Sequence, residues 1–253
     1  RCEIGHDARG TNRTSWNESM FPTWPDEAVY NATGYGPYPF WAPGTPNTGS
    51  MTEGAPIQSW FSALQNSERL DHNGECQLEG LGPDLRSPAE IAAGVAPRTP
   101  RNGPCTHLFV GERAWLFSQD RAFCCRSSTP NSTCHLTRPQ KDFWRAFKLQ
   151  GVSDYTSESG YYQGKVKNYT MSLSKPWQNF WFWYVTDMHD RPIEQGEGPC
   201  VSPRGCNHGP KYLFHQYNPR TFRASAVPPS VFDVPEVCTG RDVQDCLVGP
   251  ITS

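Results

Sequence analysis

The sequence predicts a mainly β fold of the α+β class: a curved antiparallel sheet with a few short helices, preceded by an irregular N-terminal arm. From Thr106 onward, runs rich in β-branched and aromatic residues alternate with Gly, Pro, Asn or Asp clusters, a pattern typical of antiparallel sheets. Residues 1–104 hold 12 of the 24 prolines and 12 of the 22 glycines, which favours ordered but irregular chain. We therefore expect an arm at 1–104, a β domain at 105–238 and a tail at 239–253.

The expected strands all lie in the second half of the chain, where turn-forming residues separate them. They span Thr106–Val110, Arg113–Ser118, Ala146–Gln150, Tyr161–Leu173, Gln178–Thr186, Lys211–Tyr217 and Thr221–Ala224.

Three short helices are expected beside these strands. Within Pro56–Leu64 the apolar residues recur at i, i+3, i+4 and i+7, the spacing of an amphipathic helix. Ser87-Pro88-Ala89-Glu90 forms a capping box that begins a second helix, which Gly94 ends. Thr137 to Gln140 forms another capping box. We expect the apolar stripes of the first two helices to face the core.

Composition and charge exclude two classes of partner. The net charge is -2, and Lys and Arg are scattered, whereas nucleic-acid binders carry a basic face or stripe. A membrane span needs roughly 20 consecutive apolar residues, and the longest aromatic run is Phe180 to Val185. We expect a protein with no nucleic-acid partner and no membrane span, and we interpret Arg1 as a mature N-terminus from which a targeting segment was removed.

Cysteines and glycosylation acceptors predict an extracellular location. An even number of cysteines, ten, in a chain rich in turn residues indicates a disulfide framework formed outside the cytosol. Asn-X-Ser/Thr acceptors recur along the same chain. We therefore expect a secreted or cell-surface glycoprotein. The cysteines are Cys2, Cys76, Cys105, Cys124, Cys125, Cys134, Cys200, Cys206, Cys238 and Cys246, and the acceptors are Asn12, Asn17, Asn31, Asn131 and Asn168.

Disulfide connectivity is open at the sequence level, with a few local constraints. Cys200 and Cys206 flank a turn-forming loop that a hairpin bridge would close, and Cys238–Cys246 is a similar candidate. Adjacent residues in a strand point to opposite faces, so Cys124 and Cys125 should have different partners. Cys134 is a candidate partner for one of them. A zinc site using these three cysteines and His135 is a weaker alternative, because paired CxxC spacing is missing.

Two strands indicate how the sheet is covered. In Asn168–Leu173, alternation places Tyr169, Met171 and Leu173 on one face and Asn168 on the other, which a glycan at Asn168 would make the solvent face. Phe180–Val185 does not alternate, so both of its faces must be covered. The second cover is core with helices, a hydrophobic ligand, or another chain.

The chain from Cys124 to Cys238, about 110 residues of the C-terminal half, resembles the ependymin-related and LolA-like domains of secreted eukaryotic proteins. The most specific part of the resemblance is the extended Val227-Pro-Pro-Ser-Val-Phe-Asp-Val-Pro-Glu-Val-Cys238 segment. The order of shorter words agrees as well. These are Cys124-Cys125, Phe143-Trp144, Gly151, Tyr162 to Thr170, Trp183-Tyr-Val185, Arg191 to Glu194, Lys211 to Phe214 and Tyr217.

The resemblance implies a half-open barrel with short helices in its concavity and no catalytic activity or cofactor. Members of the family are thought to bind lipid-like ligands, to associate with calcium or extracellular matrix, and to dimerise. A hydrophobic small molecule and a homo-oligomeric or matrix partner are therefore expected. The residues expected to line the hydrophobic cavity are Tyr169, Met171, Leu173, Trp181, Trp183 and Phe214.

No familiar catalytic motif is present: the chain has no GxSxG, HExxH, P-loop or EF-hand sequence. Asp187-Met-His189-Asp190 has the residue types for metal binding or acid–base chemistry, but such a group is more often a solvated turn. We therefore expect no catalytic residues and no metal, and a carrier for a hydrophobic ligand. The alternatives are a structural or adhesive subunit of an extracellular matrix or filament, and an extracellular hydrolase of unrecognised type.

Overall fold

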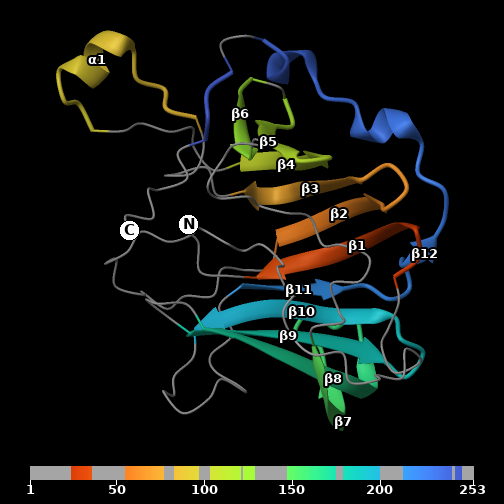
Figure 1. Ribbon diagram of the computed structural model, residues 1–253. Helices are drawn as coiled ribbons and strands as arrows, with labels where there is room; N and C mark the ends of the chain where they lie inside the picture. Colours follow the sequence, from red (N-terminus) through yellow and green to blue (C-terminus); the bar gives the residue numbers. More distant parts are fainter. Residues whose placement is uncertain are drawn as a thin grey trace, which may run out of the picture.

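The computed structural model of the protein describes residues 24–35, 55–76, 83–96, 103–120, 122–128, 147–174, 179–199, 213–240 and 243–246. These residues form one antiparallel sheet of 12 strands that is not closed (Figure 1). The strand order is β6-β5-β4-β3-β2-β1-β11-β10-β9-β8-β7, and β12 pairs with β1 beside this path. The mainly β, antiparallel fold expected from the sequence is confirmed.

The elements follow one another along the chain as two meanders that meet at the β1–β11 pair. Their bounds are β1 Glu27–Tyr35, β2 Ala55–Ser62, β3 Ser67–Cys76, α1 Pro88–Ala92, β4 Gly103–Val110, β5 Arg113–Ser118, β6 Cys124–Ser128, β7 Lys148–Thr156, β8 Gln163–Ser174, β9 Asn179–Asp187, β10 Pro192–Pro199, β11 Leu213–Tyr217, β12 Arg223–Ala224, and the 3-10 helices η3 Pro229–Phe232 and η4 Glu236–Cys238.

The N-terminal region is not only an irregular arm, because three of its segments are strands in the middle of the sheet. β1, β2 and β3 lie between β4 and β11 and connect the two meanders. Residue 104 is therefore no boundary of the sheet, and the expectation of an irregular arm is wrong for these segments. Averaging composition over residues 1–104 hid the strands, because the prolines and glycines cluster between them.

The helix expected over Pro56–Leu64 is strand β2. Ile57, Ser59 and Phe61 alternate along it and are 3%, 0% and 1% exposed. Trp60 packs on the opposite face against Leu108 and its neighbours, and Leu64 lies 72% exposed after the strand. Both faces of β2 are covered, so apolar residues appear on both, and the combined pattern imitates helical spacing.

The helix expected at Ser87 is confirmed as α1. The Ser87 side chain accepts a hydrogen bond from the backbone N–H of Glu90, and the Glu90 carboxylate accepts one from the backbone N–H of Ser87. The expectation that its apolar stripe faces the core is wrong, because Ile91 is 50% exposed and α1 buries no residue. The capping box at Thr137 lies outside the described residues.

The strands expected in the second half are found, with shifted ends. β5 has the expected bounds, whereas β7 begins two residues later than expected and continues to Thr156. Two strands were not expected, β6 and β10. The Gly, Glu and Pro residues of Pro192–Pro199 have low strand propensity, and pairing with β9 and β11 outweighs it.

Pairing register divides the side chains of the sheet between two faces. Residues directly opposite one another share a face, so Tyr30, Ser59 and Leu70 lie on one side of the central strands. We call this side the aromatic face, because Phe61, Tyr169, Tyr184 and Tyr217 also belong to it. The other side, which carries Arg69, Leu108, Trp115 and Phe117, we call the strap face.

The aromatic face is filled by side chains of the protein itself. Trp24, just before β1, packs edge-on against Tyr30 and Phe61 with ring centroids 5.3 and 5.5 Å away. Its indole N–H donates to the Tyr184 hydroxyl at 3.0 Å. Trp24 also makes edge-on contacts with Tyr217 and Phe222. The centre of this face is therefore a packed aromatic core.

Replacing Tyr184 with Phe tests this packing. The substitution leaves the buried Trp24 indole N–H without its acceptor, and an unsatisfied buried donor costs about 1–3 kcal/mol. We expect the free energy of unfolding to fall by about 1–2 kcal/mol in a denaturant titration, at the lower end of that cost because water can partly compensate. An unchanged midpoint would show that Trp24 does not occupy this position.

The strap face is covered by residues 227–238, which we call the strap. In Figure 1 this blue segment passes from the β12 end of the sheet towards β6. Val227 and Phe232 of the strap are buried against Leu108, Trp115 and Phe117. The strap thus completes a second apolar core on the side opposite Trp24.

Two disulfides fasten the C-terminal segment to β6. Cys124 bonds Cys238 and Cys125 bonds Cys246. The expectation that the adjacent cysteines have different partners is confirmed, since Cys124 packs in the strap-face core and Cys125 beside Cys105 and Leu116.

Several narrower expectations about the cysteines are wrong. Cys238 and Cys246 do not bond one another, and neither Cys124 nor Cys125 bonds Cys134. The two adjacent cysteines are therefore not zinc ligands. Cys105 is also disulfide-bonded. Cys76 ends β3, and Cys2, Cys134, His135, Cys200 and Cys206 lie outside the described residues.

The aromatic strand is covered on both faces, as expected, over its described side chains. Trp183, Tyr184 and Val185 are 5%, 0% and 4% exposed. Tyr184 packs in the aromatic core around Trp24. Trp183 and Val185 pack on the strap face with other buried side chains, which are Val166, Ile193 and Phe214, together with the partly buried Tyr35, Tyr155 and Tyr162.

Candidate functional site

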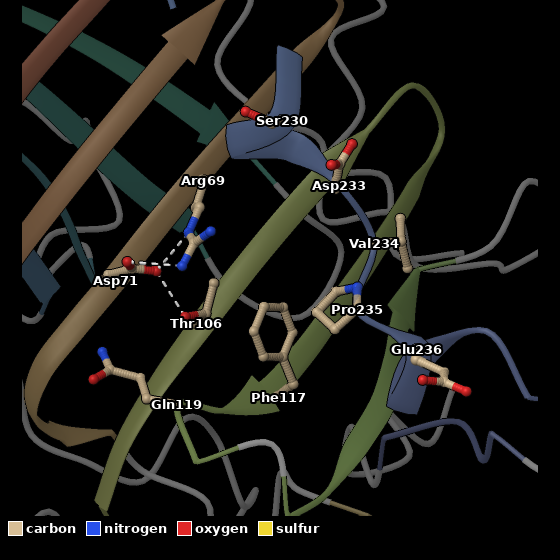
Figure 2. Close-up of a pocket in the computed structure, with 10 residues that line it drawn as sticks. All are labelled: Arg69, Asp71, Thr106, Phe117, Gln119, Ser230, Asp233, Val234, Pro235 and Glu236. Carbon is tan, nitrogen blue, oxygen red and sulfur yellow. Dashed lines mark hydrogen bonds and ion pairs between the residues drawn. The ribbon is translucent and has the colours of Figure 1, made fainter. Parts of the chain in front are cut away.

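A polar pocket of about 570 Å³ lies between the strap and strands β3 to β5 (Figure 2). The floor comes from the sheet and the opposite wall from η3, η4 and the chain between them. The lining residues are Arg69, Asp71, Thr106, Phe117, Gln119, Ser230, Asp233, Val234, Pro235 and Glu236.

A hydrogen-bonded unit of three side chains forms the polar floor. Arg69 and Asp71 are two residues apart on β3, so they project from the same face. The Arg69 Nε and Nη2 atoms donate to Asp71 Oδ1 and Oδ2 at 2.8 and 3.0 Å. Thr106 lies on β4 directly opposite Asp71, and its hydroxyl donates to Asp71 Oδ1 at 2.6 Å. This paired arrangement orients the guanidinium and the carboxylate before any ligand arrives.

The strap is hydrogen-bonded to the sheet beside the pocket. Arg69 Nη1 donates to the Val231 carbonyl at 3.2 Å, and the guanidinium carbon lies 5.5 Å from the ring centre of Trp60. Gln65 Nε2 donates to the Val227 carbonyl at 2.8 Å. Arg69 therefore both lines the pocket and holds the strap that forms its opposite wall.

Much of the hydrogen-bonding capacity in the lining is unused. A guanidinium has five N–H groups, and the hydrogen bonds of Arg69 to Asp71 and Val231 use three of them. Gln119 donates through Nε2 to the His72 carbonyl and the Asn73 side chain, which leaves its Oε1 as an acceptor. Asp233 and Glu236 are exposed on the strap. Three carboxylates thus share the lining with one guanidinium.

The ionisable side chains of the lining are one guanidinium and three carboxylates. The lining residues include no histidine, cysteine or lysine. The described parts of the chain contain no group of three or more His, Cys, Asp or Glu that could hold a metal ion. The arrangement offers polar recognition by preoriented donors and acceptors.

The six residues expected to line a hydrophobic cavity do not share one surface. Tyr169 and Met171 belong to the aromatic core. Trp183 pairs with Thr170, and Phe214 pairs with Tyr35 and packs with Trp183, which places both on the strap face. The aromatic strand is apolar on both sides, so the sequence could not show which of its residues face Tyr169. Leu173 and Trp181 lie on β8 and β9, paired with Phe180 and Ser172.

Two of the expected glycosylation acceptors, Asn31 and Asn168, lie among the residues that the structure describes. Asn31 is exposed on β1. Asn168 is half-buried on β8, and its Nδ2 donates to Ser153 Oγ at 2.9 Å. Asn12, Asn17 and Asn131 lie outside the described residues.

A buried carboxylate network lies on the strap face, away from the pocket. Glu194 is 1% exposed. Its Oε1 accepts from the Trp183 indole at 2.7 Å, and its Oε2 accepts from Gln216 Nε2 at 2.8 Å and from the Tyr155 hydroxyl. Burial and the Glu194 charge raise the pKa of Tyr155, so this hydroxyl stays a donor. The network is internally satisfied and stabilises the sheet.

Three histidines on the aromatic-face side form a second polar group. His72 pairs with Cys105, and its ring centroid lies 5.5 Å from that of His107. Burial and then the other two imidazoles lower the pKa of His72 well below its usual range. Burial, followed by His215, lowers the pKa of His107 to about 4, and burial lowers the pKa of His215 to about 4. The imidazoles are therefore neutral near pH 7.

The Asp187–Asp190 group is a turn between β9 and β10. Asp187 is 2% exposed and accepts from the backbone N–H groups of His189 and Arg191 and from Arg191 Nε. Asp190 has a φ of 63° and pairs with Lys167 at 2.7 Å. The carboxylate of Asp187 thus organises the turn.

Comparisons with known proteins give no match to a family model or a curated protein, and a weak match to a solved structure. A solved structure described as an uncharacterized conserved protein from Thermus thermophilus aligns with 87% of this chain and 90% of its own. Its sequence identity is 8% and its TM-score 0.40. The described part of the chain also has no helix with the length and apolarity that crossing a membrane requires.

Proposed function

We propose that the protein is a secreted, disulfide-bonded N-glycoprotein that binds a small polar ligand, without catalysing a reaction, in the pocket under the strap. The observation that carries this proposal is the Arg69–Asp71–Thr106 unit, which is preoriented at the floor of a pocket of about 570 Å³. Pockets of roughly 300–1,000 Å³ with a few fixed polar groups are typical of small-molecule sites.

The extracellular part of the proposal is supported by bond chemistry. Cys124–Cys238 and Cys125–Cys246 are disulfides, and disulfides persist mainly in oxidising compartments. The five Asn-X-Ser/Thr acceptors of the sequence agree with passage through a secretory pathway.

The packing favours a polar ligand over the lipid-like one that the resemblance to ependymin-related domains implies. A lipid in the concavity would have to displace Trp24 from its contacts with Tyr30, Phe61 and Tyr184. Those side chains are at most 6% exposed. The strap pocket needs no such displacement, because its polar groups already line open space.

A thermal-shift titration of the full chain with small polar compounds tests the site. The panel is neutral sugars, amino acids, amines and phosphate. We expect at least one compound to raise the melting temperature, and Asp233→Ala to weaken its binding at least tenfold. Asp233 is exposed and makes no described side-chain hydrogen bond, so its removal should leave the fold intact. Glu112→Gln, on the exposed turn after β4, is the matched control.

The outcome that would overturn the proposal is equally specific. The proposal is wrong if no polar compound shifts the melting temperature, or if substitutions at Arg69 and at Asp233 both leave the shift unchanged. A lipid retained through purification and lost on substitution of Trp24 would place the site on the aromatic face instead.

A further inference from the structure

We infer that the ligand of the strap pocket is a neutral, hydroxyl-rich molecule, a monosaccharide or short oligosaccharide. This inference rests on the proposed function, and it follows from which hydrogen-bonding groups of the lining are still free and from their charges.

The free groups are of both kinds, donors and acceptors. Arg69 retains two N–H groups beyond those given to Asp71 and Val231. Gln119 presents Oε1 as an acceptor, whereas Thr106 is 0% exposed and only positions Asp71 through its hydrogen bond. Ser230, Asp233 and Glu236 add a hydroxyl and two carboxylates from the strap. Hydroxyl groups both donate and accept, so a polyol can satisfy the whole lining.

The charges disfavour the two obvious ionic alternatives. A phosphate or carboxylate would have to approach three carboxylates, while the one guanidinium is already paired to Asp71 through two hydrogen bonds. Repulsion from Asp71 is the least screened, because its side chain is only 14% exposed. An ammonium ion donates hydrogen bonds but accepts none, so it would leave the free N–H groups of Arg69 unsatisfied. A neutral molecule avoids both penalties.

The pocket also has an apolar strip. Figure 2 shows Phe117 and Pro235 between the Arg69–Asp71 pair on one side and Glu236 on the other, with Val234 beside Pro235. A sugar ring presents C–H groups on its faces and hydroxyls around its edge. That distribution matches an apolar strip between two polar groups, with the ring edge directed at Asp71 and the strap carboxylates.

The experiment measures binding of four probes to the full chain by saturation-transfer NMR and calorimetry: neutral monosaccharides, a neutral disaccharide, a diamine and inorganic phosphate. We expect a neutral sugar to bind. Asp71→Asn should weaken its affinity at least tenfold, because the amide replaces an acceptor of ligand hydroxyls with a donor. Asp233→Ala should also weaken it, and this exposed residue keeps the test valid if the Asp71 variant folds poorly. Glu112→Gln should bind like the wild type.

The outcomes separate this inference from the proposed function. Binding of the diamine or phosphate, but no sugar, with loss in the Asp233 or Asp71 variant, would overturn the sugar assignment and leave a polar-ligand pocket. Sugar binding that neither variant changes would place the sugar elsewhere and overturn the inference. Absence of binding by all four probes would overturn the inference and remove the support for the proposed function.

Discussion

A chain in which Cys124 and Cys238 are both replaced by Ser is expected to lose about 2–5 kcal/mol of stability, the usual cost of removing a native disulfide. The bond joins residues 114 apart in sequence, so its loss frees a long loop in the unfolded state. In the folded state it frees the end of the strap, where η4 contacts β6. We expect a lower denaturation midpoint together with weaker ligand binding in the strap pocket.

The second disulfide supplies a matched control. Cys125–Cys246 closes a loop of similar length, with a sequence separation of 121, but it fastens the chain after the strap, where Cys246 also donates through its backbone N–H to the Arg126 carbonyl. Replacing Cys125 and Cys246 with Ser should lower stability without releasing the strap. Hydrogen exchange of residues 229–238 distinguishes the two variants: only loss of Cys124–Cys238 should speed it. Equal exchange in both variants would contradict the assigned role of the strap disulfide.

Acidification is expected to destabilise the protein through three histidines, of which His72 is buried and His107 and His215 are half-buried. An unfolded imidazole has a pKa of 6.5, whereas burial lowers the pKa of His107 and His215 to about 4 and that of His72 well below its usual range. The unfolded state therefore binds more protons between about pH 6.5 and 4. The contribution is fully present above pH 6.5 and is lost as the pH falls towards 4. Partial exposure of two of the three imidazoles reduces the expected effect. For the three groups together, we expect the free energy of unfolding to fall by about 3 kcal/mol between pH 7 and 5.

Urea titrations at pH 7, 6 and 5 measure this dependence, and single variants assign it. His107→Gln should flatten the decline in free energy by roughly a third, because it removes one of the three groups. His189→Gln, on the exposed turn after β9, should leave the decline unchanged. A wild-type protein equally stable at pH 7 and 5 would show that these imidazoles are not buried as neutral groups.

Features controlled by neighbouring residues could be predicted from the sequence. The capping box at Ser87 needs only four consecutive residues, and α1 forms as expected. Alternation of side chains along a strand was sufficient to separate Cys124 from Cys125, and their partners lie on opposite sides of β6. The uninterrupted apolar run from Phe180 to Val185 correctly indicated a strand covered on both faces, as its described side chains show.

Features that depend on pairing between distant strands were not predictable. β2 has apolar residues on both faces, and only its register with β1 and β3 shows which residue faces which side. For the same reason, Trp183 and Phe214 were expected in one cavity with Tyr169, although they lie on the opposite face of the sheet. The strap pocket combines residues near 70, 106, 119 and 233, which no local motif connects. From the sequence, Thr106 was only the first residue of an expected strand. Nothing local indicated the hydrogen bond that its hydroxyl donates to Asp71.

The central claim is that the protein binds a polar ligand under its strap while its aromatic face is filled by Trp24 and its neighbours. Native mass spectrometry of the full chain secreted by a eukaryotic host, incubated with an equimolar mixture of neutral sugars and a fatty acid, tests both parts together. The account predicts a sugar adduct that Asp233→Ala reduces, and no fatty-acid adduct. A fatty-acid adduct that persists in Asp233→Ala, without any sugar adduct, would contradict it.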